Sequence, residues 1–127
     1  MAASALFMAV LGLVATFLPQ EIVAWAGGSS GGILPLFVQI AGALYLAFAV
    51  LDWTAKDSLI GGIYARPLSL GNLLHFAVGA ITLLKAIYAG HREPAMLVAA
   101  AAYSVFAISF AWIIFFWSPV KREALPD

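Results

Sequence analysis

The chain has 127 residues, of which 65% are hydrophobic and only 9% are charged, and its formal net charge is zero. Soluble domains carry about 25% charged residues, and a chain this short has too few buried positions to hide so much apolar surface. Lipid is therefore its expected solvent, and the balanced charge gives no sign of a nucleic-acid partner. Cysteine is absent, which excludes disulfides, thiolate metal sites, thiol nucleophiles and covalent attachment of c-type haem.

Four apolar stretches are each long enough to cross a bilayer: about residues 2–18, 33–56, 67–88 and 94–117. A spanning helix needs about 20 mostly apolar residues, and we take each stretch to meet that requirement. The sequence therefore predicts an all-α fold, an integral membrane four-helix antiparallel bundle. We expect residues 1–127 to form a single transmembrane domain whose main partner is the lipid bilayer.

Pro19 ends the first stretch and opens a short segment. We predict that this segment is an interfacial turn of helix, with Trp25 at the level of the lipid headgroups. A secretory signal is the competing interpretation, because residues 6–18 resemble an h-region and residues 24–26 fit a small-x-small cleavage site. No Lys or Arg precedes residue 56, so the basic n-region is missing and we expect the first span to be retained.

The basic residues predict the orientation of the spans. Four spans place both termini on the same side as the connection between the second and third spans. That side carries Lys56, Arg66, Lys121 and Arg122, whereas the opposite side carries Lys85 and Arg92. By the positive-inside rule, we expect both termini to lie in the cytoplasm.

Each span has one face of small or polar residues at helical spacing, and the remaining faces carry bulky apolar side chains. In the first span this face comprises Ala5, Met8, Gly12, Ala15 and Pro19, and in the fourth span Ala100, Ser104, Ala107 and Ala111. Small residues let two helix backbones approach closely, so we expect these faces to pack inside the bundle.

The second and third spans carry polar residues on the corresponding faces. Ionisable groups at membrane depth are costly and usually face a protein interior, so they are the default candidates for a site. We call the predicted set the polar cluster, near the cytoplasmic ends of the two spans: Asp52, Asn72, His75, Arg66, Tyr45, Gln39 and Lys56. Helix register predicts three pairs within it: Asp52 with Asn72, His75 with Tyr45, and Arg66 turned toward Asp52.

Six members of the polar cluster also have a purely structural interpretation. Asp52 and Lys56 are four residues apart and fit an ion pair near the membrane interface. Arg66 fits a topology determinant, Asn72 and Gln39 fit hydrogen bonds between helices, and His75 fits an interior histidine with satisfied hydrogen bonds. These alternatives stay open at the level of sequence.

Motifs of known chemistry are missing. The chain has no Ser-His-Asp set at usable spacing, no HExxH and no glycine-rich phosphate loop. His75 and His91 lie at opposite ends of the third span, which argues against a haem held between them. We therefore expect no metal and no cofactor, and an enzyme is the last of the function classes that we consider.

Several segments resemble small four-helix bacterial inner-membrane proteins of the DoxX-like type. They are residues 18–27, 39–45 and 52–53, and the segment 61–67 with Gly71, Asn72 and His75. The resemblance covers the first three spans and implies a four-helix bundle in a bacterial inner membrane, crossed several times by the chain. The wider fold group is linked to the binding of lipidic molecules, but no catalytic residue carries over from the resemblance.

The leading functional hypothesis is a bundle that binds or transports a small lipidic or amphipathic ligand, whose polar head meets the polar cluster. The first alternative is a structural or accessory subunit of a homo-oligomer or larger membrane complex, in which the polar residues only lock helices together. The second is an ion or proton pathway through an oligomer, with Asp52 and His75 as relay groups.

Overall fold

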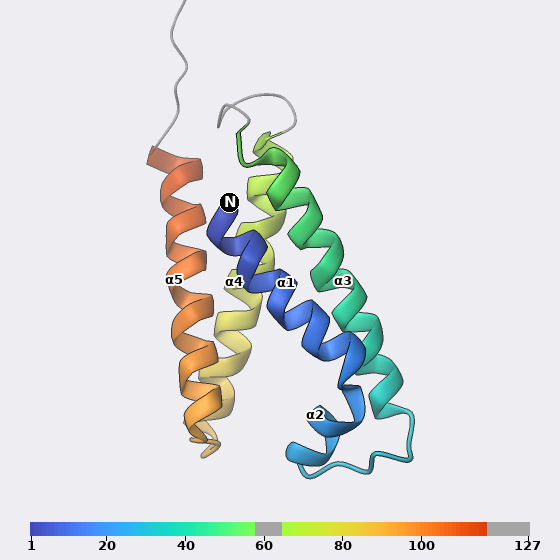
Figure 1. The fold of residues 1–127 in the computed structure, drawn as a ribbon. Coiled ribbons are helices and arrows are strands. Elements are labelled where there is room, and N and C mark those ends of the chain that lie inside the picture. Colours follow the sequence, from blue (N-terminus) through green and yellow to red (C-terminus); the bar gives the residue numbers. More distant parts are fainter. Residues whose placement is uncertain (58–64, 117–127) are drawn as a thin grey trace, which may run out of the picture. The chain divides into compact units, whose positions relative to one another are not determined.

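The computed structural model describes residues 1–57 and 65–116, which form five helices and no strand. The chain divides into an N-terminal unit, Met1–Asp57, and a C-terminal unit, Ser58–Asp127. The N-terminal unit contains α1 (Ala2–Phe17), α2 (Pro19–Trp25) and α3 (Leu34–Ala55), and the C-terminal unit contains α4 (Ala65–Tyr88) and α5 (Pro94–Phe116) (Figure 1). The prediction of an all-helical protein is confirmed for these residues, while the single domain stays a prediction.

Among the described residues, three helices are long and apolar enough to cross a membrane: Leu34–Ala55, Arg66–Tyr88 and Pro94–Phe116. They support the prediction of a membrane protein. The first predicted span differs, because α1 has only 16 residues and reaches about 24 Å at the helical rise of 1.5 Å per residue. Only α1 and α2 together are long and apolar enough to cross a membrane, and the two helices meet at a bend of 91°. The expectation that each stretch alone has spanning length is therefore wrong for the first.

The bend between α1 and α2 lies at Leu18 and Pro19. Proline has no N–H to donate and a φ suited to the first helical position, so Pro19 starts α2 at no cost in hydrogen bonds. Leu18 leaves the helical region at φ −124° and ψ 43°, and its N–H still donates to the carbonyl of Val14 at 2.9 Å. The short helix predicted after Pro19 is confirmed as α2, and its place at the membrane interface stays a prediction.

In the N-terminal unit, α1 and α3 run in opposite directions and pack along each other, and α2 also packs against α3 (Figure 1). The backbones of α1 and α3 lie close together at Gly12 and Gly42. A Cβ at Gly12 would lie 2.9 Å from the backbone nitrogen of Leu46, and one at Gly42 would lie 2.8 Å from that of Thr16. Only glycine allows two backbones so near each other, so the predicted small face of the first span is a packing face.

In the C-terminal unit, α4 and α5 pack together through aromatic rings. Phe76 is fully buried and stacks on Phe106, with ring centroids 4.7 Å apart. It also meets Tyr103 edge-on at 5.3 Å and Phe110 at 5.9 Å. The absence of a side chain at Gly79 leaves space for the Tyr103 ring, because a Cβ at this position would overlap the ring.

The start of α4 differs from the predicted one by two residues. α4 begins at Ala65 rather than at Pro67, so Arg66 lies in its first turn instead of in the preceding connection. The first turn of a helix has N–H groups without helical partners, which is why a proline is tolerated there. α5 is described as far as Phe116, and Trp117, the predicted last residue of that span, lies outside the described residues.

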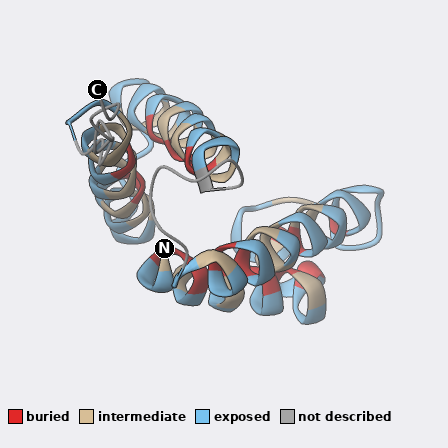
Figure 2. Cartoon of the chain, turned by 90° about the horizontal axis from the view of Figure 1, so that it is seen from above, coloured by how far each residue is buried: buried red, intermediate tan, exposed pale blue. Residues whose placement is uncertain are grey.

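The outward faces of the long helices are apolar. Figure 2 shows buried positions as narrow stripes along the helices, with exposed positions over the rest of their surface. The exposed side chains include Leu44, Val50, Leu74, Ile81, Ile108 and Phe115, each at least half exposed. Continuous apolar surface of this kind is foreign to soluble monomers and suits contact with acyl chains.

Candidate functional site

Asp52 and Ser4 form a buried polar pair in the N-terminal unit. Because α1 and α3 are antiparallel, the start of α1 meets the last turns of α3, and the two side chains are 1% exposed or less. The Ser4 hydroxyl donates to Oδ2 of Asp52 at 2.5 Å, and the carbonyl oxygen of Met1 lies 2.7 Å from the same hydroxyl. A hydroxyl has one hydrogen, so the two oxygens share it.

Ser4 is a residue that sequence reasoning missed. It precedes Ala5 on the predicted small face of the first span, and a helix places it one turn from Met8. A hydroxyl on the packing face of a mostly apolar helix was the available signal. Burying a carboxyl without a donor costs several kcal/mol, so Asp52 required such a donor from a neighbouring helix.

Other members of the polar cluster in the N-terminal unit lie further from Asp52. Gln39 is thirteen residues away, about 20 Å along α3, and its Nε2 donates to the backbone carbonyl of Thr16 at 3.2 Å. Gln39 therefore links α3 to α1 and does not join Asp52. Tyr45 is half-buried on α3, seven residues from Asp52 and about 10 Å along the helix.

Lys56 lies at the end of α3, beside an exposed aromatic ring and an acid. Its Nζ is 3.2 Å from Oδ2 of Asp57 and 4.4 Å from the centroid of the Trp53 ring. The Asp57 side chain is 85% exposed, and exposed ion pairs contribute at most about 1 kcal/mol. Lys56 thus presents a cation at the helix end.

The C-terminal unit holds the remaining members of the polar cluster. Asn72 is fully buried, and its Nδ2 donates to the carbonyl of Leu68 at 3.1 Å. Arg66 is exposed in the first turn of α4. His75 is half-buried, and the centroid of its ring lies 5.2 Å from that of Phe76 and 5.6 Å from that of Tyr103.

Two further polar side chains lie on the same helix pair, and sequence reasoning did not select them. Ser69 is 2% exposed and lies one helical turn before Asn72, and Tyr103 is 6% exposed on α5. The predicted pairs of Asp52 with Asn72 and of His75 with Tyr45 join the two units, and they stay predictions.

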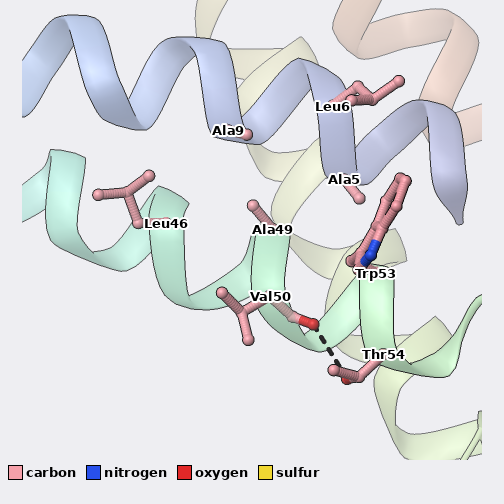
Figure 3. Close-up of a pocket in the computed structure, with 8 residues that line it drawn as sticks. All are labelled: Ala5, Leu6, Ala9, Leu46, Ala49, Val50, Trp53 and Thr54. Carbon is pink, nitrogen blue, oxygen red and sulfur yellow. Dashed lines mark hydrogen bonds between the residues drawn. The ribbon is translucent and has the colours of Figure 1, made fainter.

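An open apolar groove lies between α1 and α3 (Figure 3). It has a volume of about 320 Å³, within the range of about 300–1,000 Å³ typical of ligand sites. Its lining residues are Ala5, Leu6 and Ala9 of α1, and Leu46, Ala49, Val50, Trp53 and Thr54 of α3. Ala5 and Trp53 are the chain neighbours of Ser4 and Asp52, so the groove passes beside the buried polar pair.

Within residues 1–57 and 65–116, no group of three or more histidine, aspartate or glutamate side chains is placed to hold a metal ion. Comparison with protein-family models, with curated proteins and with solved structures finds no match for this chain. In the N-terminal unit, the Ser4–Asp52 hydrogen bond lies beside an apolar groove.

Proposed function

We propose that this chain is an integral membrane four-helix bundle that binds or transports a small lipidic or amphipathic molecule. The polar head of the molecule would meet the polar cluster around Asp52, Asn72 and His75, and its hydrocarbon part would lie on apolar helix faces. The likeness to DoxX-like proteins of bacterial inner membranes belongs to the same proposal. An intramembrane ionisable residue is a site hypothesis by default.

The observation that carries the proposal is the complete burial of Asp52 and Asn72 in helices that are otherwise apolar. Hydrogen bonds between membrane helices contribute about 0.6 kcal/mol on average. Burying a carboxyl and an amide therefore adds little to the stability of a bundle, which favours a role for these groups in a site. Placement of an open apolar groove beside Asp52 supports the same function.

The proposed topology has α1 with α2, α3, α4 and α5 as four antiparallel crossings, with both termini in the cytoplasm. The native chain has no cysteine, so single cysteines at Ser29 and at Ser58, which lies outside the described residues, can be labelled without background. We expect a membrane-impermeant maleimide to reach the two positions from opposite faces of the membrane. Labelling of both from one face would contradict the topology.

Binding is tested by native mass spectrometry of the full chain released from mild detergent. We expect a co-purified lipidic molecule on the native protein and its loss from His75→Ala and Asp52→Asn. Ser109→Ala is the matched control, because this exposed hydroxyl bonds only to the carbonyl of Val105 in its own helix. Retention of the molecule by all variants would contradict the assignment of the polar cluster.

An accessory or structural subunit is the second candidate function. The Ser4–Asp52 and Gln39–Thr16 hydrogen bonds favour it, since both join α1 to α3. Thermal unfolding separates the candidates. A binding site predicts that His75→Ala lowers the melting temperature less than Gly79→Leu, which drives a side chain into the Tyr103 ring. The reverse order would favour the structural role.

A further inference from the structure

We infer that the groove between α1 and α3 binds the hydrocarbon chain of a fatty acid, with the carboxylate of the acid at Lys56. The inference rests on the proposed function and names the class of ligand. It concerns residues of the N-terminal unit alone.

The lining of the groove selects for hydrocarbon. The lining side chains are apolar, and the polar groups among them are the Thr54 hydroxyl and the indole N–H of Trp53. The Thr54 hydroxyl is directed to its own helix, 2.9 Å from the carbonyl of Val50 and 3.0 Å from that of Leu51 (Figure 3). A polar group placed deep in this groove would lose its hydrogen bonds to water and gain none in return.

The dimensions of the groove select for one chain. The lining of α3 runs from Leu46 to Thr54, which is about 12 Å along the helix axis. A volume of about 320 Å³ over that length suits one extended alkyl chain. Alanines at positions 5, 9 and 49 create this narrow space between the helices (Figure 3).

A cation beside the Trp53 wall of the groove favours an anionic head group. Trp53 forms one wall at the end where α3 terminates, and the Lys56 ammonium lies 4.4 Å from the centroid of that ring. The partner of Lys56 is the 85% exposed Asp57, an ion pair weak enough for a second carboxylate to replace. One ammonium beside a one-chain groove fits a fatty acid better than a two-chain phospholipid.

Quenching of Trp53 fluorescence tests the inference. The full chain, with Trp25, Trp112 and Trp117 replaced by phenylalanine, is placed in phosphatidylcholine nanodiscs and titrated with stearic acid that carries a nitroxide at mid-chain. We expect saturable quenching that unlabelled stearic acid reverses. Quenching that only rises linearly, as partition into the bilayer gives, would overturn the inference.

Variants locate the bound chain. Ala9→Leu fills the groove, and Val50→Phe narrows it from an exposed rim, where packing is not disturbed. We expect each to weaken binding at least about tenfold. Ala47→Leu adds the same volume as Ala9→Leu on an exposed part of α3 outside the groove, and it should leave binding unchanged. Equal effects of Ala9→Leu and Ala47→Leu would overturn the inference.

Head-group selectivity is tested with Lys56→Gln. This variant should weaken binding of the labelled acid and leave the weaker binding of the corresponding labelled alcohol unchanged. Equal saturable quenching by a nitroxide-labelled phosphatidylglycerol would show that bilayer lipid occupies the groove, and it would overturn the fatty-acid assignment.

The two proposals fail in different ways. If native mass spectrometry finds a ligand that is lost from His75→Ala but retained by Ala9→Leu, the groove inference fails and the proposed function stands. If Ala9→Leu abolishes saturable quenching while His75→Ala and Asp52→Asn leave it intact, the groove is supported and the placement of the head around Asp52, Asn72 and His75 fails.

Discussion

The two units bring their helices together by different means. In the N-terminal unit, Gly12 and Gly42 allow the backbones of α1 and α3 to approach each other directly. In the C-terminal unit, rings fill the space between α4 and α5, and Gly79 only makes room for Tyr103. The first arrangement depends on the absence of side chains, whereas the second depends on large side chains that fit one another.

This difference predicts opposite sensitivities. Added volume should damage the N-terminal unit most, because a backbone cannot turn aside as a side chain can. Lost volume should damage the C-terminal unit most, because a ring that is removed leaves a cavity and breaks several aromatic contacts. Four substitutions test the comparison, and all are measured as thermal unfolding of the full chain in one detergent.

Phe76→Ala should have the largest effect. Phe76 is fully buried and contacts three aromatic rings of α5, and truncation of a buried phenylalanine costs about 3–5 kcal/mol. Leu74→Ala is the control, because Leu74 is 65% exposed on the same helix and should change stability little. Similar losses for the two variants would contradict an aromatic core in this unit.

Gly42→Leu should come next, with a loss of about 3 kcal/mol, since overpacking costs about 1–3 kcal/mol and occasionally more. Its Cβ would lie 2.8 Å from the Thr16 backbone nitrogen. The neighbouring Ala43 is exposed, so Ala43→Leu should be tolerated. An equally tolerated Gly42→Leu would show that α1 and α3 are not held at backbone distance.

Ser4→Ala should have an intermediate effect. It removes a donor from the buried Asp52, and the loss of a hydrogen bond to a buried polar group costs about 1–2 kcal/mol. The exposed Ser109 donates within its own helix, so Ser109→Ala should cost less. If the two serine variants have the same melting temperature, the Ser4–Asp52 bond contributes nothing to the packing of α1.

Gln39→Ala should have the smallest effect. Its bond to the Thr16 carbonyl is 3.2 Å long and exposed, and such bonds between membrane helices contribute about 0.6 kcal/mol. In the double variant with Ser4→Ala, the two losses of unfolding free energy should add, because the two hydrogen bonds lie at opposite ends of α3. A combined loss clearly larger than the sum would mean that the Ser4–Asp52 and Gln39–Thr16 hydrogen bonds are energetically coupled.

Most of the packing face of α1 could be predicted from sequence, with Ser4 as the buried residue that was missed, and that of α5 could not. All five residues of the predicted face of the first span are buried: Ala5, Met8, Gly12, Ala15 and Pro19. In α5, Ala100 is buried, but Tyr103 and Phe110 are buried in place of the predicted small residues that follow it. The rule that small residues face inward applies to backbone packing and fails where aromatic rings stack.

The candidate site shows the same division. Asp52 and Asn72 could be selected from sequence, because polar groups in apolar helices are conspicuous and costly. The partnership of Ser4 with Asp52 depends on the antiparallel crossing of α1 and α3, over 48 positions of sequence. Spacing within one helix cannot predict a contact between two helices. The same spacing grouped Gln39 with Asp52, although the two residues lie thirteen positions apart along α3.

The 91° bend at Pro19 has a consequence for the choice of membrane. α1 reaches about 24 Å, whereas a typical hydrocarbon core is about 30 Å thick. If α1 crosses the bilayer, the lipids around the N-terminal unit must thin to match it, at a cost of a fraction of a kcal/mol per Å. The melting temperature should then rise in nanodiscs of shorter-chain lipids, and the protein would partition toward the thinner regions of a mixed membrane.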